Sequence, residues 1–154
     1  MMPELHDRSS LGVLEAHVDQ WLDQQLVENP MVAAVERDTT ASRRWFVRLL
    51  GESKDAFTIR FELGQRTLRY ETYVMPAPEE NHERFYAHLL ERNLHLFGAA
   101  FAIGEEGAIF LRGALHNELI TTDGELDRVL GSLYAWVEQF FPPALRIGYA
   151  SKFD

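Results

Sequence analysis

Residues 57–74, FTIRFELGQRTLRYETYV, decide the fold that the sequence predicts. Apolar and polar residues alternate on both sides of Gly64–Arg66, which is the period of half-buried strands joined by a turn. The same alternation occurs upstream at Trp45, Val47 and Leu49. The three runs predict an antiparallel meander with one apolar and one solvated face, and helices should cover the apolar face only.

The register of the hairpin within this stretch has two alternatives. A two-residue turn at Gly64–Gln65 places Arg60 across from Arg69. A four-residue loop instead places Arg60 opposite Glu71, and it also places Glu62 opposite Arg69. Cross-strand charge pairs stabilise a sheet by only about 0.2–1 kcal/mol, so both registers stay open, with the four-residue loop favoured by its opposite charges.

Helical periodicity predicts three helices around the strands. The first begins at a cap formed by Ser9 or Ser10 and ends at Asn29–Pro30. The second begins at Pro78, whose fixed backbone angle suits a first helical turn, and ends near Asn93.

The last helix is predicted to begin at the capping box Thr122–Glu125 and to end before Pro142–Pro143. Between the second and last helices, the apolar runs 99–103 and 108–111 flank a turn and predict a second hairpin, deeply buried. Residues 31–42 fit either a short strand or an irregular approach to the sheet, and both interpretations stay open.

The predicted order is therefore α-β-β-β-α-β-β-α, an α+β fold with an antiparallel sheet of about five strands backed by helices. A chain of 154 residues is long enough for one self-sufficient core. No repeat or linker divides it, so we expect a single domain over residues 1–154, with residues 1–8 as a flexible N-terminus.

Composition narrows the function classes. The formal net charge of −9 opposes non-specific binding to nucleic acids and to anionic membranes. The N-terminus lacks the features of a signal peptide, and the longest nearly apolar stretch, Leu96–Ile103, is too short to span a bilayer. Together with the absence of Cys, these features predict a cytoplasmic protein that does not cross membranes.

The sequence contains no local motif that is typical of an active site. His88, Glu91 and His95 share one helical face, but the two imidazoles lie two turns apart, about 10 Å, which one metal ion does not bridge. No phosphate-binding loop, nucleophile elbow or zinc-protease motif occurs in the chain. We expect no catalytic residues, no metal and no cofactor, and hence no enzyme.

Aromatic and apolar residues of the meander are the candidate contact surface. Phe46 and Leu50 fall on the opposite pleat from Trp45, so one set is covered by another segment or presented to a partner. With Tyr73, these residues form a candidate partner-binding or dimer surface, although cover by the same chain or by a second subunit is favoured over a client site.

Four segments of the chain, Gly64–Tyr73, Met75–Asn81, Leu89–Asn93 and Arg146–Ser151, resemble the YbjN-domain family of bacterial proteins in its actinobacterial form. The resemblance covers roughly Arg43–Phe153. It implies the fold of type III secretion chaperones, which are acidic homodimers and bind extended segments of partner proteins by strand addition and in apolar grooves.

The resemblance specifies the fold more closely than the function, because one fold hosts many activities. The resemblance transfers no catalytic residue, and it marks five motif positions of unknown role: Tyr70, Glu71, Asn81, Arg92 and Asn93. The expected function is a chaperone-like or adaptor protein, a cytoplasmic homodimer that binds an extended segment of an unidentified partner. The alternative is a sensory or stress regulator that binds a small ligand between the sheet and the helices.

Overall fold

The computed structural model describes residues 7–38, 40–41 and 43–153. Within these residues the chain forms three α-helices, α1 (Arg8–Glu28), α2 (His82–Asn93) and α3 (Glu125–Gly148). They surround six strands: β1 (Val32–Arg37), β2 (Arg44–Leu50), β3 (Ala56–Leu63), β4 (Thr67–Met75), β5 (Ala99–Ile103) and β6 (Ile109–His116).

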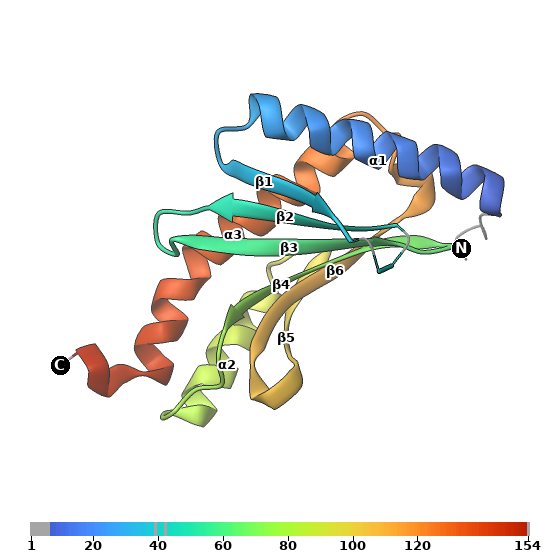
Figure 1. The fold of residues 1–154 in the computed structure, drawn as a ribbon. Helices are drawn as coiled ribbons and strands as arrows, with labels where there is room; N and C mark the ends of the chain where they lie inside the picture. The colour runs from blue at the N-terminus through green and yellow to red at the C-terminus, as the bar shows by residue number, and fades with distance from the viewer. Residues whose placement is uncertain (1–6, 39, 42, 154) are drawn as a thin grey trace.

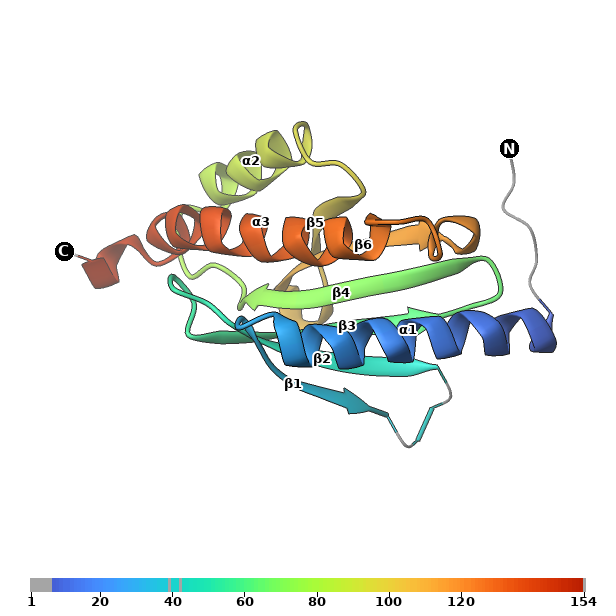
Figure 2. The same cartoon turned by 90° about the horizontal axis from the view of Figure 1, so that it is seen from above.

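The strands form one antiparallel sheet in the order β1-β2-β3-β4-β6-β5. Helices α1 and α3 lie side by side over one face of the sheet, and α2 lies beside α3 near the β5 edge (Figures 1 and 2). The other face carries no helix among the described elements, as an antiparallel sheet with one solvated side permits. The predicted α+β architecture is confirmed.

The core lies between the sheet and the two helices above it. Alternate side chains of the meander point toward the helices and are buried: Trp45, Val47, Leu49, Phe57, Ile59, Phe61, Leu63, Leu68, Tyr70, Thr72 and Val74. Val18 and Leu22 of α1 meet them from above, as do Leu133 and Val137 of α3. The period-two pattern of the sequence therefore identifies the core face correctly.

The four-residue loop alternative is confirmed. Leu63 pairs with Leu68, and the Arg60 guanidinium binds the Glu71 carboxylate at 2.8 Å across the solvated face. One pair further along, Arg69 binds Glu62 at 2.8 Å. These opposite charges sit on adjacent strands of the exposed pleat, where they fix register and leave the core face unchanged.

The sheet has six strands where the sequence predicts about five. The additional strand is β1, which lies within the segment 31–42 whose state the sequence leaves open. Val32 is buried, but the strand then bulges between Val32 and Ala34, and Glu36 and Arg37 are exposed. Because the bulge and the exposure break the alternation, periodicity does not identify this strand.

Two helix starts differ from their predicted caps. Asp7 caps α1, since its carboxylate accepts a hydrogen bond from the Ser10 N–H at 2.8 Å, so the predicted Ser9 or Ser10 cap is wrong. Helix α3 begins at Glu125 after Gly124, whose φ of 80° turns the chain into the helix, and no side-chain cap forms. The predicted capping box at Thr122 is therefore wrong.

The predicted end of α3 is also wrong, because the helix continues through Pro142–Pro143 to Gly148. Its last turns are held from outside the helix. The Gly148 carbonyl accepts from the N–H groups of Glu79 and Glu80 at 3.0 and 3.1 Å, and the Tyr149 hydroxyl donates to the Ala77 carbonyl at 2.6 Å. These contacts outweigh the local preference of the two prolines to stop a helix.

The same contacts delay the start of α2. The sequence predicts a first turn at Pro78, but Asn81 precedes the helix in the left-handed region, with φ 54°, and α2 begins at His82. The second hairpin forms as predicted, yet it is not deeply buried, because β5 is the last strand of the sheet and Ile103 is exposed.

At the N-terminus, Asp7 and Arg8 lie at the start of α1, within the segment 1–8 whose flexibility stays a prediction. The rest of that prediction falls on residues 1–6, which lie outside the described residues. In the described part of the chain, no helix combines the length and apolarity needed to cross a membrane.

Candidate functional site

The two outer strands of the sheet each have one edge without a neighbouring strand. Among the described residues, β1 pairs only with β2, and β5 pairs only with β6. Along an antiparallel strand, residues alternately direct their N–H and C=O groups toward the paired strand and away from it. The outward groups are a template on which a strand of another chain can pair.

The outer edge of β1 is open. The Asp38 N–H donates to the Arg44 carbonyl at 2.9 Å, so Asp38 faces β2, and by alternation Val35 and Arg37 direct their backbone groups outward. Within the described residues, no hydrogen bond from a side chain reaches these outward groups. Figure 2 shows β1 at the rim of the sheet, on the side away from α2 and α3.

The outer edge of β5 is capped at its middle residue, Phe101, by one side chain of α2. The Asn93 Oδ1 accepts a hydrogen bond from the Phe101 N–H at 2.7 Å, and the Asn93 Nδ2 donates to the Phe101 carbonyl at 3.1 Å. The carboxamide thus makes the two hydrogen bonds that a neighbouring strand would make at the middle of β5. The two edges of one sheet are therefore chemically different.

An exposed apolar surface lies outside the closed edge. Its four residues, Leu90, Leu94, Phe97 and Ile103, are between 62% and 80% exposed, and we call them the α2–β5 surface. A groove of about 240 Å³ runs between α2 and β5 beneath Leu90 and Ile103. Leu90 and Ile103 meet at this groove, and large exposed apolar patches on monomeric proteins mark interaction sites.

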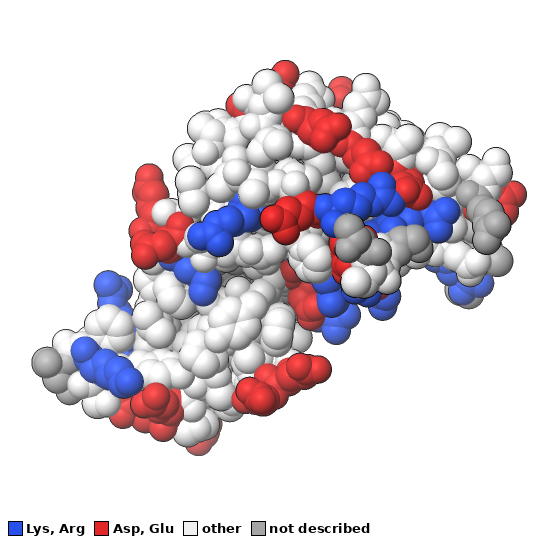
Figure 3. Space-filling view, in the orientation of Figure 1, with Lys and Arg blue, Asp and Glu red and all other residues white. Residues whose placement is uncertain are grey.

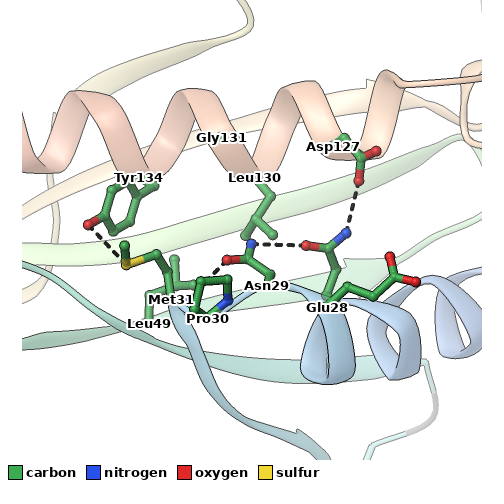
Figure 4. A pocket seen from close by; sticks show the side chains of 10 residues that line it. Glu28, Asn29, Pro30, Met31, Leu49, Asp127, Leu130, Gly131 and Tyr134 are labelled. Atoms are coloured by element: carbon green, nitrogen blue, oxygen red, sulfur yellow. Dashed lines mark hydrogen bonds between the residues drawn. The ribbon is translucent and has the colours of Figure 1, made fainter.

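A pocket of about 400 Å³, the α1–α3 pocket, opens where the end of α1 approaches α3 (Figure 4). Leu49 of β2 and Leu130 of α3 line it together with Met31 and Tyr134. The Tyr134 ring stacks on Phe57 with centroids 6.0 Å apart, and its hydroxyl lies 3.6 Å from the Met31 sulfur. These contacts hold the apolar wall in place.

The opposite wall of this pocket is polar. The Asp127 Oδ1 accepts hydrogen bonds from the Trp21 Nε1 at 2.8 Å and from the Gln25 Nε2 at 3.0 Å. The Gln25 Oε1 accepts from the Asn29 Nδ2 at 3.0 Å, and the Asn29 Oδ1 accepts from the Met31 N–H at 3.0 Å. These hydrogen bonds tie α1 to α3 along one side of the pocket, and Figure 4 draws those that run from Asp127 through Gln25 and Asn29 to Met31.

Charged side chains gather where α1 meets the strands. Glu15 and Asp19 of α1 pair with Arg37 of β1, and Glu15 also pairs with Arg43 at 3.0 Å. Figure 3 shows these opposite charges as adjacent red and blue bands. The Arg37 guanidinium also lies 4.9 Å from the centre of the Trp45 ring. The cluster fastens α1 to β1 and leaves the outer edge of β1 uncovered.

The four residues of the predicted contact surface do not form one surface. Trp45 is 1% exposed and donates through Nε1 to Asp19 at 2.7 Å, so the structure places it in the core, and a role on an accessible surface is wrong for this residue. Phe46 is half-buried on the solvated face, where Leu50 and Tyr73 are each 44% exposed. A partner role for these three residues stays a prediction.

Tyr70 and Glu71, the first two motif positions, hold the sheet together. The Tyr70 hydroxyl donates to the Gly98 carbonyl at 2.6 Å, passing over Gly113 on the neighbouring strand, and burial raises the pKa of the phenol. Any side chain at Gly113 would collide with the Gly98 carbonyl, 2.0 Å from the position of its Cβ. Glu71 makes the cross-strand pair with Arg60.

The remaining motif positions surround α2. Asn81 donates through Nδ2 to the Ile147 carbonyl at 2.9 Å and so joins the start of α2 to the end of α3. Asn93 closes the β5 edge. Arg92 approaches Glu91 at 3.5 Å, and its buried Nε has no hydrogen-bond partner among the described residues. Four of the five motif positions therefore link separate elements of the fold, and among these contacts the sequence alone indicates only that of Glu71 with Arg60.

His88 lies on α2, but His95 lies in the turn after the helix ends at Asn93, so the expected shared helical face is wrong for this pair. Glu91 and His95 are exposed, whereas His88 is half-buried, and burial lowers the pKa of its imidazole. Among residues 7–38, 40–41 and 43–153, no three His, Cys, Asp or Glu side chains come together in a group that could hold a metal ion.

Sequence reasoning misses both the capped edge and the α2–β5 surface. The signal for the second is present, because apolar residues on α2 occupy two faces: Phe85 and Leu89 enter the core, while Leu90 points outward. An apolar stripe wider than one packing face indicates a second contact. No sequence signal gives the Asn93 contact, since its partner lies beyond a turn.

The comparisons with known proteins point to one family. A family model described as "YbjN: Putative bacterial sensory transduction regulator" matches residues 14–146. The chain is 35% identical over 109 residues to an uncharacterized protein of Mycobacterium leprae, covering 71% of this chain and 59% of that protein. It is also 35% identical over 106 residues to uncharacterized proteins of Mycobacterium bovis and Mycobacterium tuberculosis, covering 69% of this chain and 57% of each.

Proposed function

This chain belongs to the YbjN family, and from that membership and its two unlike sheet edges we propose that it is a non-enzymatic, chaperone-like adaptor. In this proposal the chain binds an extended segment of a partner protein as an added strand along β1. The observation that carries it is the contrast between the open β1 edge and the β5 edge that Asn93 closes. The chain spans less than two thirds of the length of its mycobacterial relatives. The proposal therefore concerns this domain alone.

Strand addition at β1 needs no rearrangement of the fold. The outward N–H and C=O groups of Val35 and Arg37 supply the hydrogen bonds that position an added strand. The small side chains of Ala33 and Ala34 leave room for the side chains of that strand. The ion pairs of Arg37 with α1 hold β1 rigid, which lowers the entropy lost on binding.

The non-enzymatic half of the proposal rests on the sequence motifs. The motif positions whose contacts are described brace the fold: Tyr70 and Glu71 act within the sheet, and Asn81 and Asn93 at α2. A binding function requires only the accessible edge that these residues keep in place.

A proline substitution tests the β1 site. Val35→Pro removes an outward N–H that no sheet hydrogen bond uses, so the variant should fold, as prolines on edge strands do. Val35→Ala keeps the N–H and is the matched control. Proteins retained from a bacterial lysate by the wild type and by V35A should be lost with V35P, and a peptide from a retained protein should protect the Arg37 amide from hydrogen exchange. Equal retention by a folded V35P would refute the site.

We further propose that the protein is a homodimer in which the α2–β5 surfaces of two copies meet. A partner strand cannot pair with β5 at Phe101 while Asn93 occupies its edge, so this surface offers side chains alone. Leu90 of α2 and the exposed apolar residues of the α2–β5 surface can pack against the same residues of a second copy about a two-fold axis. Burial of Leu90, Leu94, Phe97 and Ile103 would remove the most exposed apolar cluster beside the sheet from water.

Light scattering tests the dimer. The wild type should give a mass near twice the 17.8 kDa of one chain. Leu90→Glu should give a monomer, because it places a charge in the apolar contact, whereas Val13→Glu, at a site on α1 that is 67% exposed, should remain dimeric. A wild-type mass near one chain, or a dimer that survives Leu90→Glu, would sink the proposal.

The family description as a sensory regulator supports a second candidate function, the binding of a small ligand. The α1–α3 pocket favours it, because the pocket lies between the sheet and two helices and joins an apolar wall to a few polar groups.

A further inference from the structure

The α1–α3 pocket is open on its α3 side because a glycine, which has no side chain, stands at its rim. Gly131 lines the pocket, and a Cβ built at this position meets no atom within 4 Å. Its backbone is helical, so a larger residue would fill the space without strain. On the facing side, α1 ends at Glu28 and the chain turns through Pro30 into β1. The space is therefore open to a ligand of small-molecule size.

The charged side chains that line the pocket are both acidic. Asp127 and Glu28 line it, and no Lys or Arg is among the described residues that line it. The donors that reach Asp127, the Trp21 indole and the Gln25 amide, are both neutral and both bind Oδ1. They orient the carboxylate without neutralising it, and its second oxygen accepts no hydrogen bond from the described residues.

The charged groups near Tyr134 in the apolar wall are acidic as well. Burial raises the pKa of the Tyr134 phenol, and the nearby carboxylates of Glu138 and Glu52 raise it further. The ring itself is fixed against Phe57, and Met31 beside it is a flexible side chain that adapts to different shapes. A cation with an apolar body therefore finds a complementary place in this pocket, whereas an anion would face the carboxylates of Asp127 and Glu28.

We propose that the α1–α3 pocket binds a small organic cation, with its ammonium or amidinium group on Asp127 and Glu28 and its apolar body against Tyr134, Met31 and Leu49. Charge-assisted hydrogen bonds to a carboxylate are about twice as strong as neutral ones, so Asp127 should provide most of the selectivity. This ligand class rests on the second candidate function, and it is independent of strand addition at β1.

The hydrogen bond between Trp21 and Asp127 provides a built-in reporter. In a two-dimensional ¹H–¹⁵N NMR spectrum the three Trp indoles give separate signals, and only that of Trp21 should move when a cation reaches Asp127. The probes are benzamidinium, benzoate and benzyl alcohol, which share an aromatic body and differ in charge. Benzamidinium should shift the Trp21 signal to saturation at millimolar concentration, and the other two should bind at least roughly tenfold more weakly.

Two variants and one control locate the site. Asp127→Asn keeps an acceptor for Trp21 and Gln25 but removes the charge, and Gly131→Leu fills the pocket, so each should weaken benzamidinium binding about tenfold or more. Gly12→Leu changes a helical glycine that also has nothing within 4 Å, and it should bind like the wild type. Tighter binding of benzoate would overturn the ligand class and keep the pocket, whereas no binding by any probe would overturn both.

Discussion

Removing the Asn93 carboxamide gives the sharpest test of the capped sheet edge. Asn93→Ala deletes two hydrogen bonds to Phe101, at 2.7 and 3.1 Å, in a partly buried setting. Each such bond contributes about 1 kcal/mol net, so the free energy of unfolding should fall by about 2 kcal/mol. For a chain of this length the melting temperature should fall by about 4–8 °C. Glu91→Ala, an exposed change on the same helix, should stay within about 0.5 kcal/mol.

Amide hydrogen exchange separates this local effect from general destabilisation. In the wild type the Phe101 amide is held by Asn93, whereas those of Ala100 and Ala102 face β6. Under native conditions N93A should accelerate exchange at Phe101 by about 30-fold, the equivalent of 2 kcal/mol, and change the two flanking amides much less. Unchanged exchange at Phe101, or a loss of less than about 0.5 kcal/mol in urea unfolding, would refute the capping role.

Three further predictions concern the sheet itself. Gly113→Ala should unfold at markedly lower urea concentration, or fail to fold, because its Cβ would lie 2.0 Å from the Gly98 carbonyl oxygen. Tyr70→Phe loses the hydrogen bond to that carbonyl and should cost about 1–3 kcal/mol in the same assay; a cost near zero would contradict the bracing role. The hydrogen bond from Arg44 lowers the pKa of Glu62 below its ordinary 4.5, so the folded state binds fewer protons than the unfolded state just below that pH. The stability that wild type holds over Glu62→Gln should therefore be present above pH 4.5 and shrink as the pH falls through the folded pKa; a difference that is constant with pH would argue against the ion pairs.

Where one face of an element is buried, its sequence predicts the structure well. Strands β2, β3 and β4 follow from strict alternation, and the charge pairs of Arg60 and Glu62 even indicate the register. β1 escapes prediction because a bulge interrupts it and half of its residues are exposed. The sequence does not predict the end of α3, because tertiary contacts to Gly148 outweigh the tendency of Pro142 and Pro143 to end a helix.

For the candidate sites too, the sequence predicts what local patterns determine and misses what tertiary contacts determine. An apolar stripe on α2 is visible in the sequence, but which of its faces enters the core depends on how α2 packs against α3. Trp45 illustrates the reverse error, since alternation places it on the core pleat while its aromatic character suggests a contact surface. The α1–α3 pocket brings together Gln25 and Asp127, 102 positions apart, and periodicity carries no information on such a pair.

The unlike edges of the sheet also limit how far copies of this protein can polymerise. Fibrils grow when every subunit offers two receptive edges, so that each addition regenerates a growing end. Here the carboxamide on Phe101 acts as a chain terminator at one end of the sheet, while β1 remains receptive at the other. If two copies join through β1, both ends of the joined sheet carry the Asn93 cap, so strand pairing at Phe101 does not extend that sheet further. We therefore expect Asn93 to restrict extension of the sheet by strand pairing to its β1 edge.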